Sequence, residues 1–245
     1  VGGIALLEPL AVNGDAGIAL QIGDYYANPT FGNVSSERAI AFFERARELG
    51  NGSAVMRLAD LYRRGASDLG ADVGKAAELL REAAGDGNVS AMRSLAAMLL
   101  DGSVPKDAVA ARALFDQAIS TGDQNAPVEL AREMMKGSFD DAGPADALAL
   151  VAPLAETGNA GARRVVADLL RNGAEGVEKD AASSLAAYRA LGDAGDAWAA
   201  RAAAEMMIKG EAGAADFAAG IALLQPFVDK GDAGVAAQIG DYYAD

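Results

Sequence analysis

The chain has 245 residues, a formal charge of −14 at pH 7, and neither cysteine nor histidine. The negative charge argues against nucleic acid as a partner, because phosphate contacts need clustered cations. The composition also excludes a disulfide framework, cysteine-ligated zinc and a histidine general base. No apolar run approaches the roughly 18 residues of a membrane span. We therefore expect no membrane-spanning segment, no metal site and no cofactor.

The chain opens on valine, and no signal peptide is visible. We interpret residues 1–245 as one domain that is a processed or trimmed segment of a longer array. A periplasmic or exported location is favoured over a cytoplasmic one.

Glycine recurs with a fixed period along the chain. The first row, spaced by 35 to 37 residues, is Gly14, Gly50, Gly87, Gly122, Gly158, Gly195 and Gly231. A second glycine follows five of these by 15 residues, at Gly65, Gly102, Gly137, Gly173 and Gly210. The period is typical of helical repeat arrays, and a helix ends most easily at a residue that accepts a positive φ. The pattern predicts about seven helix–turn–helix units.

Each unit is expected to hold two helices. B helices end at the first glycine and are predicted at about 3–13, 36–49, 74–86, 107–121, 144–157, 180–194 and 216–230. A helices follow that glycine and are predicted at about 16–27, 53–64, 90–101, 125–136, 161–172, 198–209 and 234–244. Ser53, Ser90 and Asn125 fall where A helices begin and are good N-cap residues.

The helices carry apolar residues at helical spacing, which predicts one core face for each. On the B helices, two adjacent rows precede the glycine by eight and seven residues. These rows are Leu6, Phe42, Leu79, Leu114, Leu150, Ala187 and Leu223, and Leu7, Phe43, Leu80, Phe115, Val151, Tyr188 and Leu224. On the A helices, a small residue that permits close approach follows the glycine by nine residues, at Gly23, Ala59, Ala96, Ala131, Ala167, Ala204 and Gly240.

This unit resembles the Sel1-like repeat, a relative of the tetratricopeptide repeat. The resemblance rests on Ala54–Gly65 (AVMRLADLYRRG), Lys75–Gly87 (KAAELLREAAGDG), Gly102–Asp107 (GSVPKD) and Gly176–Asp180 (GVEKD). It implies an all-α, right-handed superhelical solenoid of antiparallel helix pairs, used as a protein-interaction scaffold whose A helices line a concave groove.

The A helices concentrate arginine against the acidic background. Positions three apart form one stripe on a helix, and we expect this stripe to face away from the core. The candidate partner-binding residues are Arg57, Asp60, Arg64, Arg93, Arg132, Arg164, Asp168, Trp198, Arg201 and Glu205. The alternative is an ordinary solvated helix face. For Trp198, the sequence leaves core packing and an exposed recognition anchor equally open.

No catalytic constellation emerges. The pair Asp140 and Asp141 reads as a solvated turn, and Asp180 as the cap of the following helix rather than a metal ligand. The tyrosine pairs 25–26 and 242–243 favour core packing or end stacking, with carbohydrate stacking as the alternative.

Residues 3–27 recur almost unchanged at 220–244. Either this is a local duplication in a trimmed array, or the ends are stacking surfaces that join molecules head to tail. We therefore expect a non-catalytic scaffold for a protein partner, with an acidic or peptide segment in the concave groove. The resemblance suggests bacterial envelope assembly or exopolysaccharide secretion as the process. A carbohydrate-binding or self-assembling solenoid is the alternative.

Overall fold

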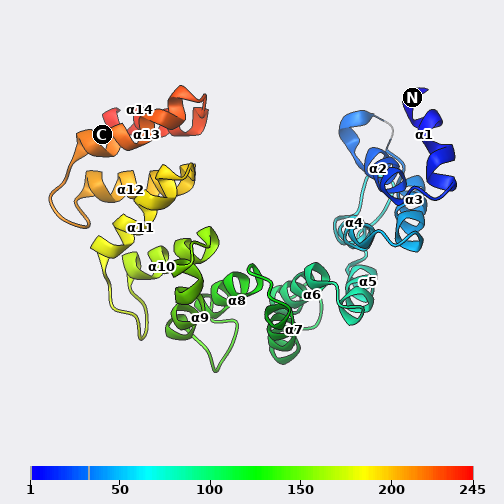
Figure 1. The fold of residues 1–245 in the computed structure, drawn as a ribbon, viewed down its shortest axis with the longest axis horizontal. Coiled ribbons are helices and arrows are strands. Elements are labelled where there is room, and N and C mark those ends of the chain that lie inside the picture. The colour runs from blue at the N-terminus through cyan, green and yellow to red at the C-terminus, as the bar shows by residue number, and fades with distance from the viewer. Residues whose placement is uncertain (1, 33, 245) are drawn as a thin grey trace. The chain divides into compact units, whose positions relative to one another are not determined.

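The computed structural model describes residues 2–32 and 34–244, except the exposure of Gly2 and the side chain of Ala5. Within these residues the chain is all-helical, with fourteen α-helices and one short 3-10 helix, Pro29–Phe31 (Figure 1). The helices are α1 (Gly2–Val12), α2 (Ala16–Ala27), α3 (Ser36–Glu48), α4 (Gly52–Arg64), α5 (Val73–Gly85), α6 (Val89–Asp101), α7 (Ala108–Ser120), α8 (Ala126–Met135), α9 (Pro144–Glu156), α10 (Ala160–Asn172), α11 (Ala181–Asp193), α12 (Ala197–Lys209), α13 (Phe217–Asp229) and α14 (Ala233–Ala244). Every predicted helix is present, and its bounds agree to within one or two residues.

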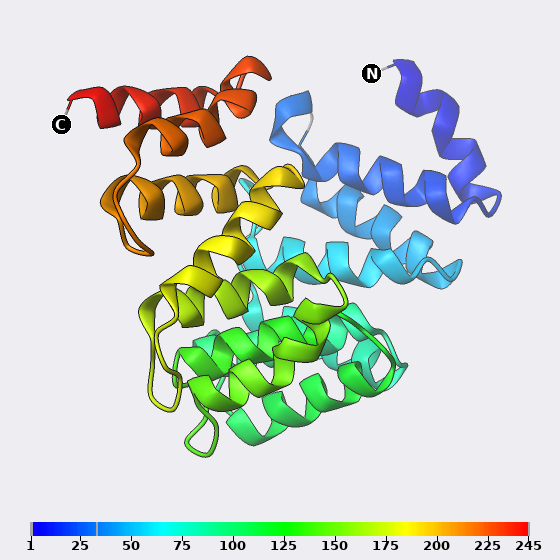
Figure 2. The same cartoon turned by 60° about the vertical axis from the view of Figure 1, so that its left-hand side comes forward.

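Two compact units divide the chain, Val1–Asp123 with α1 to α7 and Gln124–Asp245 with α8 to α14. In each unit, every helix packs on the next one along the chain (Figures 1 and 2). A helices of successive repeats also touch, as α2 touches α4 and α8 touches α10. Each unit is therefore a solenoid stack, with B helices in one layer and A helices in the other.

The predicted glycines end the helices. Around α6, Gly87 has a φ of +87° and Gly102 a φ of +83°. A side chain with a Cβ is strained in this left-handed region, whereas glycine is not. The chain can therefore reverse direction at both ends of the helix within a few residues, and the glycines at the equivalent places share the conformation.

The N-caps differ from the prediction at two positions. Ser53 and Ser90 lie inside α4 and α6, so their assignment as caps was wrong. The caps are Asn51 and Asn88, whose side chains accept hydrogen bonds from the backbone N–H of Ser53 (3.0 Å) and Ala91 (3.0 Å). Each asparagine directly follows a glycine, so the turn itself places the capping oxygen.

Two other predicted caps lie where the sequence placed them. Asn125 occupies the N-cap of α8 in a helical conformation, without a side-chain capping bond. Asp180 caps α11, where its carboxylate accepts a hydrogen bond from the N–H of Ser183 (2.9 Å).

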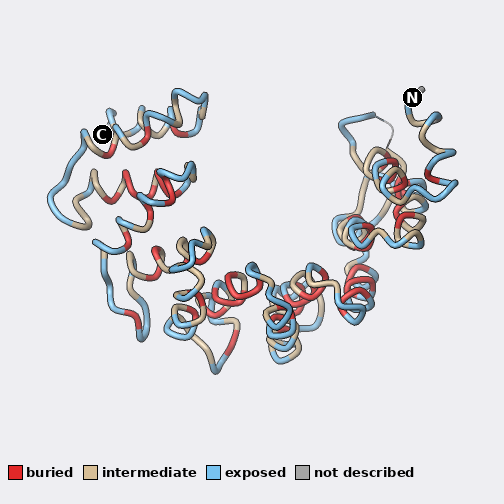
Figure 3. Tube along the Cα trace, viewed as in Figure 1, coloured by how far each residue is buried: buried red, intermediate tan, exposed pale blue. Residues whose placement is uncertain are grey.

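The core lies between the two helix layers of each unit (Figure 3). Of the B-helix row seven residues before the glycine, the members from Phe43 to Leu224 are all buried, while Leu7 is half-buried. These large side chains pack against the small residues of the A helices. A Cβ on Gly23, for example, would lie 2.4 Å from Cδ1 and Cε1 of Phe43. The helix backbones therefore approach as closely as the small-residue row predicts.

The terminal helices depart from the predicted core pattern. Leu6 is 77% exposed and Tyr243 is 69% exposed, although both occupy core positions of the repeat. In the described part of the chain, no helix packs on the outer face of α1 or of α14. The residues predicted to be buried there consequently remain in solvent.

Replacing Phe115 by alanine should lower the free energy of unfolding by about 3–5 kcal/mol, because a fully buried ring leaves a cavity. Urea unfolding followed by circular dichroism measures this. Val109→Ala is the control, since Val109 is 83% exposed and precedes Phe115 on the same helix. Similar losses in both variants would contradict the burial pattern.

Gly23→Ala and Gly240→Ala should have opposite effects, although both glycines occupy the same position of the repeat. The first places a methyl group against Phe43 and should cost about 1–3 kcal/mol through overpacking. The second meets nothing within 4 Å and should be neutral or should stabilise by up to about 1 kcal/mol, since alanine favours helix. Urea titrations of the two variants at low protein concentration measure the difference in the free energy of unfolding. Equal losses in both would refute the close-packing argument.

Candidate functional site

Three of the candidate arginines connect one repeat to the next. Each pairs with the aspartate that directly follows the glycine of the next repeat: Arg93 with Asp123 (3.4 Å), Arg164 with Asp196, and Arg201 with Asp232 (3.5 Å). Such partly exposed pairs contribute about 0.2–1 kcal/mol each. Their charges are therefore partly neutralised within the chain.

Three other candidates, Arg57, Asp60 and Arg64, come together in the first unit. They line a hollow of about 630 Å³ with Asp24 and Phe43. Arg57 pairs with Asp24 of α2 at 3.0 Å, and Asp60 pairs with Arg64 one helical turn away. Burial opposes ionisation of Asp60, yet hydrogen bonds from the arginines keep its pKa below the usual value. The hollow is thus walled by charges that compensate each other.

The second unit places Trp198 at the centre of a mixed aromatic and charged cluster. Its ring meets that of Tyr188 edge to face, with centroids 5.7 Å apart, and the guanidinium of Arg164 lies 5.0 Å above its centroid. Trp198 is nevertheless 48% exposed. Trp198 is therefore only partly packed against the core, and about half of it remains exposed, so its role as a recognition anchor stays a prediction.

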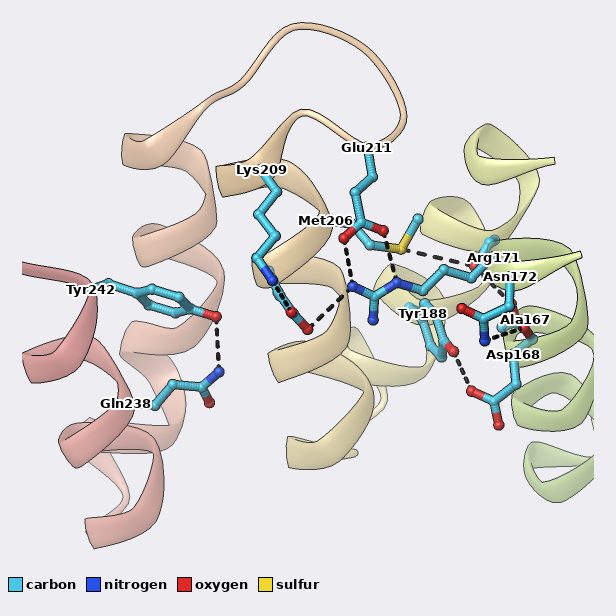
Figure 4. A network of polar contacts seen from close by, with 12 residues as sticks. Ala167, Asp168, Arg171, Asn172, Tyr188, Met206, Lys209, Glu211, Gln238 and Tyr242 are labelled. Carbon is cyan, nitrogen blue, oxygen red and sulfur yellow. Dashed lines mark hydrogen bonds and ion pairs between the residues drawn. The ribbon is translucent and has the colours of Figure 1, made fainter. Parts of the chain in front are cut away.

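Beside this cluster, Arg171 clamps α10 to the following repeat (Figure 4). Its Nε and Nη2 donate to the two carboxylate oxygens of Glu211, at 2.8 and 2.7 Å, and Nη2 lies 3.2 Å from Glu205. Lys209 also pairs with Glu205, at 2.5 Å. The hydrogen bond from Arg171 lowers the pKa of Glu211, and that from Lys209, followed by Arg171, lowers the pKa of Glu205.

Asp168 and Tyr188 form a hydrogen-bonded pair between α10 and α11 (Figure 4). Burial raises the pKa of the Asp168 carboxyl, while the hydroxyl of Tyr188 and nearby arginines, including Arg132, oppose the rise. Burial and the facing carboxylate raise the pKa of Tyr188 as well. Asp168 therefore orients Tyr188, which in turn supports the ring of Trp198.

A hollow of about 440 Å³ opens next to Trp198. Its walls are Arg171, Trp198, Arg201, Ala202, Glu205, Gly234, Ala237, Gln238 and Asp241, from three successive A helices. Gly234 makes room for Arg201, since a Cβ there would lie 2.4 Å from the arginine Nη2. Gln238 donates to the hydroxyl of Tyr242 at 2.9 Å (Figure 4). The hollow combines an exposed aromatic face with donors and acceptors.

The candidates are therefore distributed over different places. Arg164, Asp168, Trp198, Arg201 and Glu205 gather in the second unit, and Arg57, Asp60 and Arg64 gather in the first. Arg93 contributes an inter-repeat pair, and Arg132 is exposed on α8. Sequence reasoning left Arg171, Tyr188, Gln238 and Asp241 out of the site. Arg171 could have been included from the sequence, because it belongs to the arginine-rich series on the A helices.

The remaining candidate motifs do not line either of these two hollows. Tyr26 is buried, and Tyr25 stacks on Phe31 with ring centroids 5.3 Å apart. Asp140 and Asp141 are exposed in the loop before α9, as the solvated-turn interpretation predicts.

Among the described residues, no group of three or more acidic side chains is arranged to hold a metal ion. In the same part of the chain, no helix is both long enough and apolar enough to cross a membrane.

Replacing Glu211 by glutamine should destabilise the fold by about 1–3 kcal/mol at pH 7, because it removes the charge that Arg171 contacts. The carboxyl pKa is lower in the folded chain than its ordinary value of 4.5, so its stabilisation is present above that pH and is lost as the pH falls through the lowered pKa. The difference between native and variant should therefore shrink toward pH 3. Urea titrations across this range measure it, with the exposed Glu178→Gln as control. A difference independent of pH would contradict the charged clamp.

Comparison with known proteins identifies the repeat. The Sel1 repeat profile matches residues 19–51, 52–88 and 89–123. Among curated protein sequences, none matches this chain.

Solved bacterial structures share the fold. A protective antigen of uropathogenic Escherichia coli with an SLR fold is 24% identical, with a TM-score of 0.62, over 97% of this chain and 51% of its own. A Sel1 repeat protein from Oxalobacter formigenes is 22% identical, with a TM-score of 0.65, over 99% of this chain and 70% of its own. An immunity protein from Pseudomonas aeruginosa is 20% identical, with a TM-score of 0.51, over 78% of this chain and 70% of its own.

The chain thus spans about half the length of the Escherichia coli antigen. The three matched repeats lie in the first unit, and the second unit continues the same glycine spacing and the same helix pairs. Residues 19–123 of this chain therefore consist of Sel1 repeats, and residues 124–244 have the same fold.

Proposed function

We propose that this chain is a non-catalytic scaffold that binds a segment of a partner protein at the hollow beside Trp198. Sel1 repeats generally mediate protein interactions. The observation that supports this location is the half-exposed tryptophan ring, 48% accessible, in the wall of a hollow in the A-helix layer of the second unit. Tryptophan and arginine are the residues that most often dominate binding energy at protein interfaces.

The ring is held in place before any partner binds. The Tyr188 ring meets it edge to face, Arg164 covers one face, and Asp168 fixes Tyr188 in turn. A side chain that is already ordered loses little conformational entropy when it is covered by a partner. The cluster therefore provides a rigid apolar contact surface.

The charges around the ring indicate the kind of segment that fits. Arg201 provides donors on one side, while Glu205 and Asp241 provide acceptors. Because Arg164, Arg171 and Arg201 are already paired with carboxylates, the hollow has no excess positive charge for a wholly acidic partner. A peptide segment of mixed polarity, with one bulky apolar side chain for Trp198, matches these walls best.

Two finer assignments rest on different grounds. A role in the bacterial envelope or in exopolysaccharide secretion follows only from the family resemblance and remains a prediction. The carbohydrate alternative relied on tyrosines and acidic residues. Tyr26 is buried against α3, and Tyr243, although 69% exposed, contacts Phe217 edge to face. We therefore place the protein-binding function first.

Trp198→Ala should weaken binding of a partner recovered from source-cell extract by about thirtyfold, the effect of losing an anchor worth about 2 kcal/mol. Because Trp198 is the only tryptophan in the chain, its fluorescence should also shift when a purified, tryptophan-free partner peptide fills the hollow. Arg201→Glu should weaken binding too, since it places a third carboxylate in the wall.

Arg189→Glu is the matched control, because Arg189 is exposed on the B helix α11 and does not line the hollow. Helicity of each variant is compared by circular dichroism. Equal binding by native chain, Trp198→Ala and Arg201→Glu would exclude this hollow as the site. Weaker binding by Arg189→Glu alone would move the site to the B-helix layer.

A further inference from the structure

In the second unit, successive A helices face each other through two fixed positions of the repeat. The residue three after the glycine of one repeat lies against the residue six after the glycine of the preceding repeat. A Cβ on Gly161 would lie 3.2 Å from Cγ1 of Val128. The ring of Trp198 lies on the guanidinium of Arg164, whose Cζ is 5.0 Å from the ring centroid. The third position therefore decides how far the sixth position is covered.

Two neighbouring junctions share an ion pair and differ in this cover. Arg164 and Arg201 both occupy the sixth position, and each pairs with the aspartate that directly follows the glycine of the next repeat. At the first junction, Trp198 occupies the third position and supplies an aromatic cover for Arg164. At the second junction, Gly234 occupies the third position and has no side chain to offer.

Arg201 consequently lacks the aromatic cover that Arg164 has. Its guanidinium lies against the backbone of Gly234, where a Cβ would be 2.4 Å from Nη2 and 3.5 Å from Cζ. The Arg201 side chain is 35% exposed and lines the hollow of about 440 Å³. Within the described chain, no aromatic ring stacks on it. The walls of the hollow come from α10, α12 and α14, which all belong to the described chain.

We propose, building on the protein-binding function proposed for this hollow, that its occupant is an aromatic side chain of the partner, stacked on Arg201. A guanidinium attracts the face of an aromatic ring, whereas a saturated side chain of the same shape lacks this attraction. The volume of the hollow lies within the range of small-ligand pockets, about 300–1,000 Å³. A ring bound there completes the second junction in the way that Trp198 completes the first.

The walls of the hollow favour a ring with a polar tip, as in tyrosine or tryptophan. Gln238 donates its amide N–H to the hydroxyl of Tyr242 at 2.9 Å, which leaves its Oε1 as an acceptor (Figure 4). Glu205 adds carboxylate oxygens, which also contact Arg171 and Lys209. A phenol hydroxyl or an indole N–H can donate a hydrogen bond to such oxygens. Tyrosine and tryptophan thus match both the guanidinium and the acceptors of the walls.

Small probes of graded chemistry test the aromatic assignment. N-acetyl-phenylalaninamide and N-acetyl-cyclohexylalaninamide have similar shapes, but only the first has a π face. Their binding is followed by the indole N–H signal of Trp198 in a proton–nitrogen correlation spectrum, where the single tryptophan gives a single signal. The phenylalanine probe should bind about two- to fivefold more tightly, the size of a partly exposed cation–π contact. Hydrophobic burial alone gives the opposite order, because the saturated ring is the more apolar.

N-acetyl-tyrosinamide tests the polar tip. It should bind more tightly than N-acetyl-phenylalaninamide, because its hydroxyl can donate to Gln238 or Glu205 in the wall. Weaker binding of the tyrosine probe would restrict the occupant to a ring without a polar tip and would overturn this part of the proposal.

Three variants locate the ring. Arg201→Met removes the charge but keeps an unbranched side chain, and it should remove the preference for the aromatic probe. Arg189→Met is the matched control and should keep the preference, because Arg189 is exposed on α11 and does not line the hollow. Gly234→Phe places a ring at the repeat position of Trp198 and should abolish binding of all the probes by filling the hollow from within. Circular dichroism verifies that each variant keeps its helicity.

Failure of the aromatic assignment differs from failure of the binding function. Equal or tighter binding of the cyclohexyl probe, an aromatic preference that survives Arg201→Met, or a Trp198 signal unmoved by every probe would overturn the aromatic assignment. Partner binding that is lost in Trp198→Ala would in that case still support the binding function. Partner binding unchanged by Trp198→Ala and Arg201→Glu would overturn the binding function, even where the probes keep the expected order.

Discussion

The close approach of successive helices is the constraint on which the rest of the structure depends. A small residue on each A helix leaves a notch, and a large side chain of the following B helix fills it, as Phe43 fills the notch at Gly23. Dispersion contacts at this distance are individually weak and collectively large. Because every repeat forms this contact with its neighbour, the array needs no central core.

Polar side chains have a second structural role that limits where function can lie. The arginines of the A helices look like a binding stripe in the sequence, yet Arg93, Arg164 and Arg201 each pair with an aspartate of the next repeat. These pairs hold the side chains in fixed directions and partly cancel their charge. We propose that the surface between them serves recognition, and in the second unit this proposed surface centres on Trp198.

Exposure of the repeat positions follows from the same packing rule. Leu6 and Tyr243 are exposed, although the equivalent positions of other repeats are wholly or partly buried. Each equivalent position is buried by a helix of a neighbouring repeat, and no such helix packs there within the described residues. The neighbour in the array therefore decides whether a core position of the repeat is buried.

The sequence alone determined the repeat, the helices and most of the core, because these depend on local and periodic properties. Glycine at fixed spacing ends helices, and apolar residues three and four apart mark the buried face. The caps are local as well, but the helix starts were predicted too late: the asparagine directly after the glycine reaches the helix start, and Ser53 lies beyond it. Tertiary structure decided which arginines pair, because their aspartate partners lie 30 to 32 residues away, in the turn that precedes the next A helix. The exposure of Trp198 depends on the positions of Tyr188 and Arg164, which no local pattern fixes.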